Sequence, residues 1–149
     1  MVSPPRSAEG HRARAGEQAT GNRDNDRFQL AVEAVGTREM AGAIGSHQAE
    51  ARSGWCEHGI TIGAEHRCKG YAAEAAELLL RFMFAEHRFH KCQVRIFAHN
   101  EASLALHRRL GLVEESRLRE LVYLSGRHRD VVVTGLLAEE FAQLHPTTT

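Results

Sequence analysis

The sequence predicts an α/β (α+β) domain built on one mixed β-sheet. An apolar stretch over residues 55–63 precedes a helical pattern over 70–88 and an alternating stretch over 92–97. This order is typical of two parallel strands joined by a crossover helix. A hairpin pattern lies on each side of this unit, at 28–47 and 118–137. The length of 149 residues suits one domain with a single core.

The composition narrows the range of partners. Nineteen basic residues balance nineteen acidic ones, so a broad nucleic-acid-binding surface is not expected. The three cysteines show no paired spacing, which argues against a disulfide framework or a zinc site and fits a reducing cytoplasm. No apolar run approaches the roughly 20 residues that cross a membrane, and no secretory leader is recognisable. We therefore expect a cytoplasmic protein without nucleic-acid, membrane or metal partners.

Residues 1–26 are expected to form a disordered or loosely packed arm. They are polar, rich in Arg, Gly, Ser and Ala, and show no helical or strand period. A transit peptide is the alternative, but this stretch contains too many acidic residues for one. The ordered domain is predicted over residues 27–142, and residues 143–149 are expected to form a tail.

The first hairpin is predicted from residues 28–35 and 40–47. Apolar and polar residues alternate in the first stretch, as in a half-buried strand, and a glycine-containing turn connects the two. The short connection favours antiparallel pairing. A loop over 49–54 then leads into the strand at 55–63.

The stretch after that strand has the features of an anion-binding site. Arg67, Lys69 and Gly70 lie in a short loop that opens a helix. Backbone N–H groups at a helix start are unpaired, the helix dipole favours negative charge there, and a glycine lets a ligand approach closely. The turn is therefore predicted to hold a phosphate-bearing cofactor. A dinucleotide-binding fold is not expected, because no Gly-x-Gly-x-x-Gly follows a strand.

Two helices and a second hairpin complete the domain. The helix over 70–88 should present a broad apolar side to the sheet. Asn100 is a suitable N-cap for the second helix, and Gly111 occupies its left-handed C-cap position. The core-facing residues of this helix are expected to be Ala102, Ala105, Leu106 and Leu110. The last hairpin joins 118–123 to 129–137 through a Ser-Gly turn.

The loop at 67–72 reads Arg-Cys-Lys-Gly-Tyr-Ala. Further motifs follow it at Phe97–Ser103, Leu110–Leu112, Arg117–Glu120 and Gly126–Val131. From about residue 28 to residue 141, this order resembles the GNAT superfamily of acyl-CoA-dependent N-acetyltransferases, whose cofactor signature is Arg/Gln-x-x-Gly-x-Gly/Ala. The similarity is closest to the RimJ/RimL-like subgroup of ribosomal-protein N-terminal and spermidine-type acetyltransferases.

The resemblance implies a GNAT fold and acetyl-CoA, or a close acyl-CoA, as co-substrate, with no metal. In that family the strand before the loop pairs with the pantetheine arm, and the loop amides hold the pyrophosphate. On this chain the strand residues are Ile60, Thr61 and Ile62, and the loop residues are Arg67, Cys68, Lys69, Gly70, Tyr71 and Ala72. Asn100 would hydrogen-bond the arm, with Ser103 assisting from the next helical turn.

The implied reaction is direct attack of a neutral amine on the thioester carbonyl, without an acyl-enzyme. It needs a base, a donor to the developing oxyanion and an acid for the leaving thiolate. Glu57 stands where the subgroup often carries a glutamate and is the candidate base, directly or through a water. The alternative for Glu57 is a rim carboxylate at a strand end. A backbone N–H near Ile62 is the candidate oxyanion donor.

His107 stands where many family members carry a tyrosine acid. A histidine can donate a proton near neutral pH, so His107 is the candidate acid. The alternatives are a solvated histidine between Arg108 and Arg109, with solvent protonating the thiolate.

The expected acceptor is a primary amine, taken to be a protein N-terminus. A polyamine or another small amine is the alternative acceptor. The family carries a first strand and helices that residues 1–26 are too short and polar to supply. A truncated, non-catalytic CoA-binding or interaction module is therefore a rival, and a partner subunit in a homodimer is another way to close the acceptor cleft.

Overall fold

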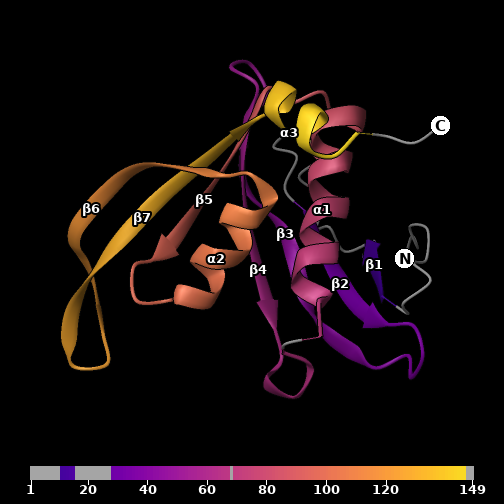
Figure 1. Ribbon diagram of the computed structural model, residues 1–149, viewed down its shortest axis with the longest axis horizontal. Helices are drawn as coiled ribbons and strands as arrows, with labels where there is room; N and C mark the ends of the chain where they lie inside the picture. Colours follow the sequence, from indigo (N-terminus) through magenta and orange to yellow (C-terminus); the bar gives the residue numbers. More distant parts are fainter. Residues whose placement is uncertain (1–10, 16–27, 68, 147–149) are drawn as a thin grey trace.

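The computed structural model of the chain describes residues 11–15, 28–67 and 69–146 (Figure 1). Within these ranges one mixed sheet has the strand order β1-β2-β3-β4-β5-β7-β6. The strands are β1 (His11–Ala15), β2 (Phe28–Ala34), β3 (Met40–Glu50), β4 (Trp55–Ile62), β5 (Lys91–Phe97), β6 (Val113–Leu124) and β7 (Arg127–Leu137). The helical segments are a 3-10 turn η2 (Ala64–His66), α1 (Tyr71–Arg81), a π-helical turn η3 (Phe82–Glu86), α2 (Glu101–Leu110) and α3 (Ala138–Leu144).

The sheet combines one parallel pair with antiparallel neighbours. β4 and β5 are parallel and are joined through α1, whereas all the other neighbouring strands run antiparallel. The β2–β3 and β6–β7 hairpins flank this unit. The predicted mixed sheet, with a parallel strand–helix–strand unit between antiparallel hairpins, is confirmed.

β4 and β5 pair only near their N-terminal ends. Their last paired residues are Glu57 and Gln93. Beyond them β4 runs on to Ile62 beside β3, and β5 runs on to Phe97 beside β7. Figure 1 shows the two strands diverging, with α2 in front of the gap. The sheet therefore has an opening whose two edges carry main-chain groups outside any β4–β5 ladder.

α1 covers the sheet beside this opening (Figure 1). Its buried face consists of Ala75, Ala76, Leu79 and Leu80, which belong to one core cluster with Ile44 and Val94 of the strands. Burial of each leucine contributes about 1.5–3 kcal/mol. The helices in the ranges given above are too short or too polar to span a bilayer.

The first helix is shorter than the predicted 70–88. Its α-helical part ends at Arg81 and continues as the π-helical turn η3 to Glu86. The backbone N–H of His87 donates to the Phe82 carbonyl at 3.1 Å, which is the i to i−5 bond of a π-turn. Apolar periodicity continues through a π-turn, so the sequence pattern does not reveal where α-helical bonding stops.

Strand β1 lies within residues 1–26, which were expected to form a disordered or loosely packed arm, and shows that residues 11–15 join the sheet. Residues 11–15 pair antiparallel with β2, from His11 opposite Ala34 to Ala15 opposite Leu30. Main-chain bonds form this pairing, and composition does not report them. The rest of the expected arm lies outside the described residues.

Helix α3 corrects the boundary predicted at residue 142. The helix continues to Leu144, and His145 still donates its backbone N–H to the Phe141 carbonyl at 2.8 Å. Phe141 is buried in the core, so tertiary packing holds this short helix in place. Residues 147–149 of the expected tail lie outside the described part of the chain.

Candidate active site

The loop between β4 and α1 has the geometry of an anion site. Gly70 is the N-cap of α1 in a left-handed conformation, with φ 81° and ψ 2°, and a Cβ there would meet no heavy atom within 4 Å. Gly70 has no side chain to cap the helix, and the start of α1 carries the positive end of the helix dipole, which favours an anion there. Arg67 and Lys69 are exposed, and Arg67 Nε donates to the Ile62 carbonyl at 3.3 Å. Cys68 lies outside the described residues.

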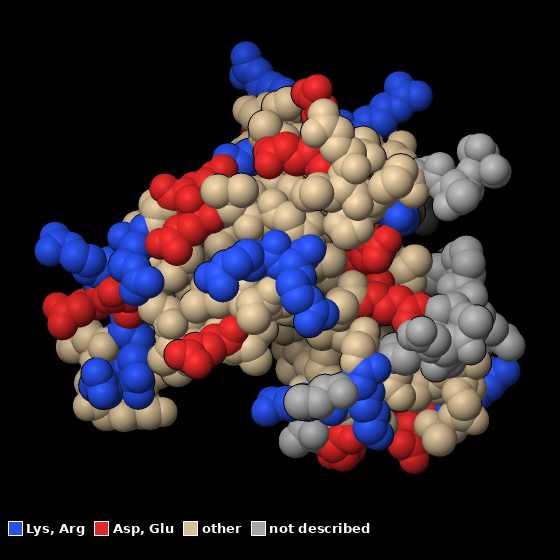
Figure 2. All heavy atoms as spheres, in the orientation of Figure 1, with Lys and Arg blue, Asp and Glu red and all other residues tan. Residues whose placement is uncertain are grey.

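A cavity of about 430 Å³ begins at Gly70 and continues between α1 and α2. Its other lining residues are Ala73, Glu74 and Glu77 of α1 and Leu106, Arg109 and Leu110 of α2. Figure 2 shows basic side chains over α2 on this face, where Arg108 and Arg109 are exposed. The volume is in the range of small-molecule sites. A phosphate-bearing ligand at the loop would extend into it.

The predicted strand residues line the opening in the sheet. Ile60 and Ile62 are half-buried and Thr61 is exposed, and all three lie beyond the last β4–β5 pair. An extended ligand can therefore pair with this edge of β4 as an added strand would. Tyr71, at the start of α1, is half-buried against the ring of His66, with ring centroids 5.9 Å apart.

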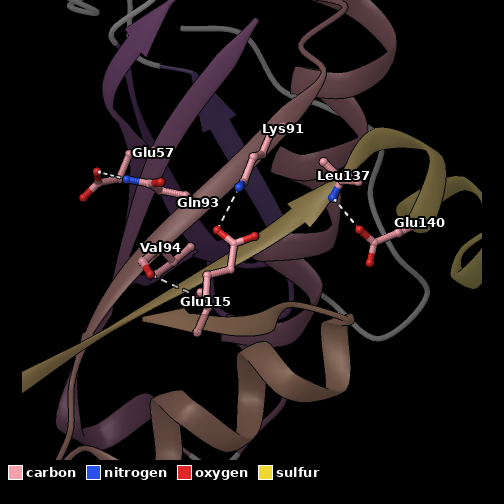
Figure 3. A network of polar contacts seen from close by, with 8 residues as sticks. Glu57, Lys91, Gln93, Val94, Glu115, Leu137 and Glu140 are labelled. Carbon is pink, nitrogen blue, oxygen red and sulfur yellow. Dashed lines mark hydrogen bonds and ion pairs between the residues drawn. The ribbon is translucent and has the colours of Figure 1, made fainter. Parts of the chain in front are cut away.

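Glu57 lies at the apex of the opening, in the last β4–β5 pair. Its carboxylate accepts a hydrogen bond from Gln93 Nε2 at 3.3 Å (Figure 3). It also faces Arg95 Nε at 3.5 Å. The Glu57 side chain is 13% exposed, so it is neither a free surface carboxylate nor sealed from a ligand. The same face carries an ion pair between Lys91 and Glu115 at 2.7 Å (Figure 3).

His107 is buried, with 1% of its surface exposed. The predicted alternative of a solvated histidine on the helix surface is therefore wrong. Its Nε2 lies 3.3 Å from Nε2 of His58, a buried residue of β4, and the two rings stack with centroids 5.4 Å apart. His58 follows Glu57 directly, so the two side chains point to opposite faces of β4. Glu57 and His107 therefore flank the apex from opposite sides of the sheet.

Burial makes both imidazoles poor bases. Desolvation, with the nearby His107 and His47 adding to it, lowers the pKa of His58 to about 3. Desolvation also lowers the pKa of His107, and its hydrogen bond to the Ser103 backbone opposes this effect. Both rings are therefore neutral near pH 7. The acid role of His107 stays a prediction, and this geometry does not favour it, because neither ring nitrogen faces solvent.

Asn100 and Ser103 were expected to contact the acyl donor, and in the structure they hydrogen-bond to each other. Asn100 Oδ1 accepts the backbone N–H of Ser103 at 3.1 Å, which confirms Asn100 as the N-cap of α2. The expected core face of α2 is partly wrong, because Ala102 and Ala105 are exposed. The inward face of α2 is formed instead by Ser103, His107 and Leu110. Their spacing by four and three residues places these side chains on one helix face. Asn100 remains exposed at the mouth of the opening, where its amide N–H₂ can still donate.

His58 is not among the site residues predicted from the sequence. The alternation of Cys56, His58 and Ile60 in β4 is a signal that would have placed His58 on the helix-facing side. Its partner on α2 could not be found this way, because sequence spacing does not show which helix face meets which strand.

The residues present fit acetyl-CoA. The opening supplies a strand edge, the loop supplies helix N-terminal amides with Arg67 and Lys69, and the cavity at Gly70 supplies space for the nucleotide end. Glu74 and Glu77 also line the cavity, but Glu77 is paired with Arg81 at 2.9 Å. This combination defines a class of protein, the transferase that binds its acyl donor in a split parallel strand pair.

Comparison with known proteins identifies the family. A family model described as an acetyltransferase (GNAT) domain matches residues 1–113. The chain belongs to the GNAT family of acetyltransferases. This confirms the predicted fold, the enzyme class of acetyl-CoA-dependent N-acetyltransferase and the co-substrate of that class.

Individual relatives agree with this assignment. The SPbeta prophage-derived uncharacterized N-acetyltransferase YokL of Bacillus subtilis (strain 168) is 30% identical over 141 residues, covering 95% of this chain and 77% of YokL. The ribosomal protein uS5-alanine N-acetyltransferase of Escherichia coli (strain K12) is 29% identical over 86 residues, covering 58% of this chain and 44% of that enzyme. Spermidine N-acetyltransferase from Vibrio cholerae, solved in complex with CoA and spermine, superimposes with a TM-score of 0.75 at 25% identity, covering 79% of this chain and 69% of that one.

Proposed function

We propose that this chain transfers the acetyl group of acetyl-CoA to a primary amine, and that the acceptor is a protein N-terminus. The observation that carries the proposal is the opening between β4 and β5, with the anion loop at one end and Glu57 at its apex. Acetyl-CoA would supply the acyl thioester. The remaining steps fall to residues of the chain.

Glu57 is the proposed base. It lies on the face of β4 away from α2 and takes the ammonium proton of the acceptor, directly or through one water. Gln93 and Arg95 hold its carboxylate in place. A backbone N–H of β4 near Ile62 donates to the charge that develops on the acyl oxygen. As the C–S bond breaks, the nitrogen loses its second proton to solvent. The leaving thiolate takes its proton from solvent, because His107 directs no proton to the opening.

The charges beside Glu57 favour an acceptor with one positive charge. Arg95 lies 3.5 Å from Glu57, and Lys91 lies 2.7 Å from Glu115, so both of these carboxylates already have a basic partner. A polyamine would bring several cations against Arg95 and Lys91. A single N-terminal amine would not, and this is why a protein N-terminus is preferred.

A polyamine is the second candidate acceptor, supported by the likeness to the Vibrio cholerae spermidine enzyme. A silent CoA-binding module is the third. The homodimer and the cytoplasmic location stay predictions. None of these alternatives changes the cofactor site.

Two measurements test the proposal. Isothermal calorimetry with acetyl-CoA should show one site, and absence of binding would exclude the transferase function. Thiol release is then measured with peptides carrying a free N-terminal alanine or serine, with the same peptides N-terminally blocked, and with spermidine and spermine. Turnover on the free peptides alone supports the proposal, turnover on the polyamines alone selects the second candidate, and binding without turnover on any amine selects the silent module.

A further inference from the structure

A buried chain of polar side chains crosses the apex of the opening on the helix side. Cys92 of β5 lies 3.2 Å from His58 Nδ1, measured from its Sγ. His58 Nε2 lies 3.3 Å from His107 Nε2. His107 Nδ1 lies 2.7 Å from the carbonyl oxygen of Ser103. This row of contacts therefore joins β5, β4 and α2, and the proposed mechanism does not use it.

One arrangement of protons satisfies every contact of this chain. A carbonyl oxygen only accepts, so the 2.7 Å contact places the His107 proton on Nδ1, donating to Ser103. His107 Nε2 is then an acceptor, and His58 Nε2–H donates to it. His58 Nδ1 is left as an acceptor for the Cys92 thiol. A hydrogen bond with Cys56 and burial raise the pKa of that thiol, so Cys92 keeps its proton.

The arrangement suits neither a metal nor a charged histidine. Cys92 and His107 contact opposite edges of the His58 ring, so one ion could not bind all three, and no group of three or more His, Cys, Asp or Glu in the described ranges could hold a metal. A second proton on His107 would bring two N–H groups together at 3.3 Å, and a second proton on His58 would place an N–H against the Cys92 S–H at 3.2 Å. The titratable groups acting on His58 are His107 from α2, His47 from β3 and Cys92 from β5.

We propose that His58 is a positioning residue: it holds His107 in the Nδ1–H form and thereby sets the spacing of β4, β5 and α2 at the apex of the opening. His58 is the first residue of β4 beyond the last β4–β5 pair, so side chains take over there from the main-chain ladder. Ser103, at the α2 end of this row of contacts, also donates its backbone N–H to Asn100 at the mouth of the opening. The link from spacing to acyl-donor binding rests on the proposed function, whereas the proton arrangement does not.

The proton arrangement is tested on the wild-type protein by long-range ¹H–¹⁵N NMR with ¹⁵N-labelled histidine. The His107 and His58 signals are assigned from His107→Gln and His58→Gln. We expect His107 as the Nδ1–H form and His58 as the Nε2–H form, both unchanged between about pH 5 and 8. The opposite form at His107, or titration of either ring within this range, would overturn the proposal.

The positioning role is tested by a double-mutant cycle of His58→Leu, His107→Leu and the double variant. We expect the effects on the unfolding equilibrium constant to be non-additive by about tenfold, because each single change breaks the same contact. Acetyl-CoA affinity should fall at least about fivefold in both single variants, and His58→Gln, which keeps an N–H donor and an acceptor, should restore most of it. His128→Leu is the control for loss of an imidazole away from the opening and the cavity, since His128 is exposed in the β6–β7 hairpin.

The outcomes separate this proposal from the proposed function. Non-additive stability effects together with weakened acetyl-CoA binding support the positioning role, even if no amine is acetylated. Additive effects, or unchanged affinity in His58→Leu, contradict it. If His107→Leu abolishes turnover while His58→Leu leaves kcat unchanged, His107 acts alone as an acid and the positioning role is wrong. If His58→Leu does not fold, His58→Gln and the wild-type NMR still decide the proton arrangement.

Discussion

The imidazoles of His58 and His107 meet at 3.3 Å between their Nε2 atoms, inside the protein, at the point where β4 and β5 separate. Two histidines this close cannot both carry a charge without strong repulsion, and burial removes the water that would screen it. The folded protein therefore contains this pair with both imidazoles neutral. This contact has consequences for stability as well as for the site.

Stability should fall as the pH is lowered through the range below 6.5. The pKa of His58 is lowered from 6.5 to about 3, so the unfolded chain binds a proton in this window that the folded chain does not. The free energy of unfolding is therefore at its full value above about pH 6.5. It falls toward pH 3 by about 1.4 kcal/mol per pH unit for this one group. Urea unfolding at pH 7.5 and pH 5.0 measures it.

His58→Gln should reduce that loss by roughly 2 kcal/mol between these two pH values. His128→Gln, which removes an exposed histidine of the β6–β7 hairpin, should leave the wild-type dependence unchanged. Equal slopes for wild type and His58→Gln would show that His58 is not the group responsible.

Gly70→Asp should weaken acetyl-CoA binding by roughly 30- to 150-fold, which corresponds to about 2–3 kcal/mol. The new carboxylate would stand at the N-terminus of α1, where the first-turn amides are proposed to hold the pyrophosphate. Gly126→Asp is a closely matched control. Gly126 also has φ 81° and open surroundings, but it lies in the β6–β7 turn. Calorimetry that finds the same loss in both variants would point to backbone strain and not to the anion site.

Glu57→Gln should lower kcat by about 100-fold or more, because it removes the proposed base but keeps the shape of the side chain. The affinity for acetyl-CoA should change by less than about threefold, since Glu57 lies on the far face of β4 from the α1–α2 cavity. Glu114→Gln, which alters an exposed carboxylate of β6 paired with Arg117, is the control. Thiol release at saturating acetyl-CoA reports the result, and full activity of Glu57→Gln would remove Glu57 as the base.

Asn100→Ala should destabilise the protein by about 1 kcal/mol through loss of the N-cap bond to Ser103. Asn100→Ser should retain most of the stability, because serine also caps helices. The same pair of variants tests the predicted contact of Asn100 with the acyl donor. If that contact exists, Asn100→Ser loses acetyl-CoA affinity at nearly unchanged stability, and unchanged affinity would assign Asn100 to capping alone.

The strand–helix–strand unit was predictable because its signals are local. Apolar alternation, a glycine in a basic loop and an N-cap asparagine each act over a few residues, and the structure places Gly70 and Asn100 at the two helix starts as expected. β1 was missed, because its support is main-chain pairing with β2, which neither composition nor an apolar period reveals. α3 was missed for a similar reason, since its seven residues depend on burial of Phe141.

His107 shows the limit of local reasoning most clearly. Its neighbours Arg108 and Arg109 are exposed, and from the sequence they make the whole turn read as solvated. The helical period alone leaves open which face is buried, because α2 contains too few large apolar residues to mark one. Packing against His58 decides it.

The sequence by itself determined the order of elements, the anion loop and the position of Glu57 on β4, because these follow from backbone preferences and from side-chain periods within each segment. Only the tertiary structure decided where β4 and β5 part, and which histidine meets which. Those features depend on contacts between segments far apart in the chain, such as His58 and His107, and on the water that their burial excludes.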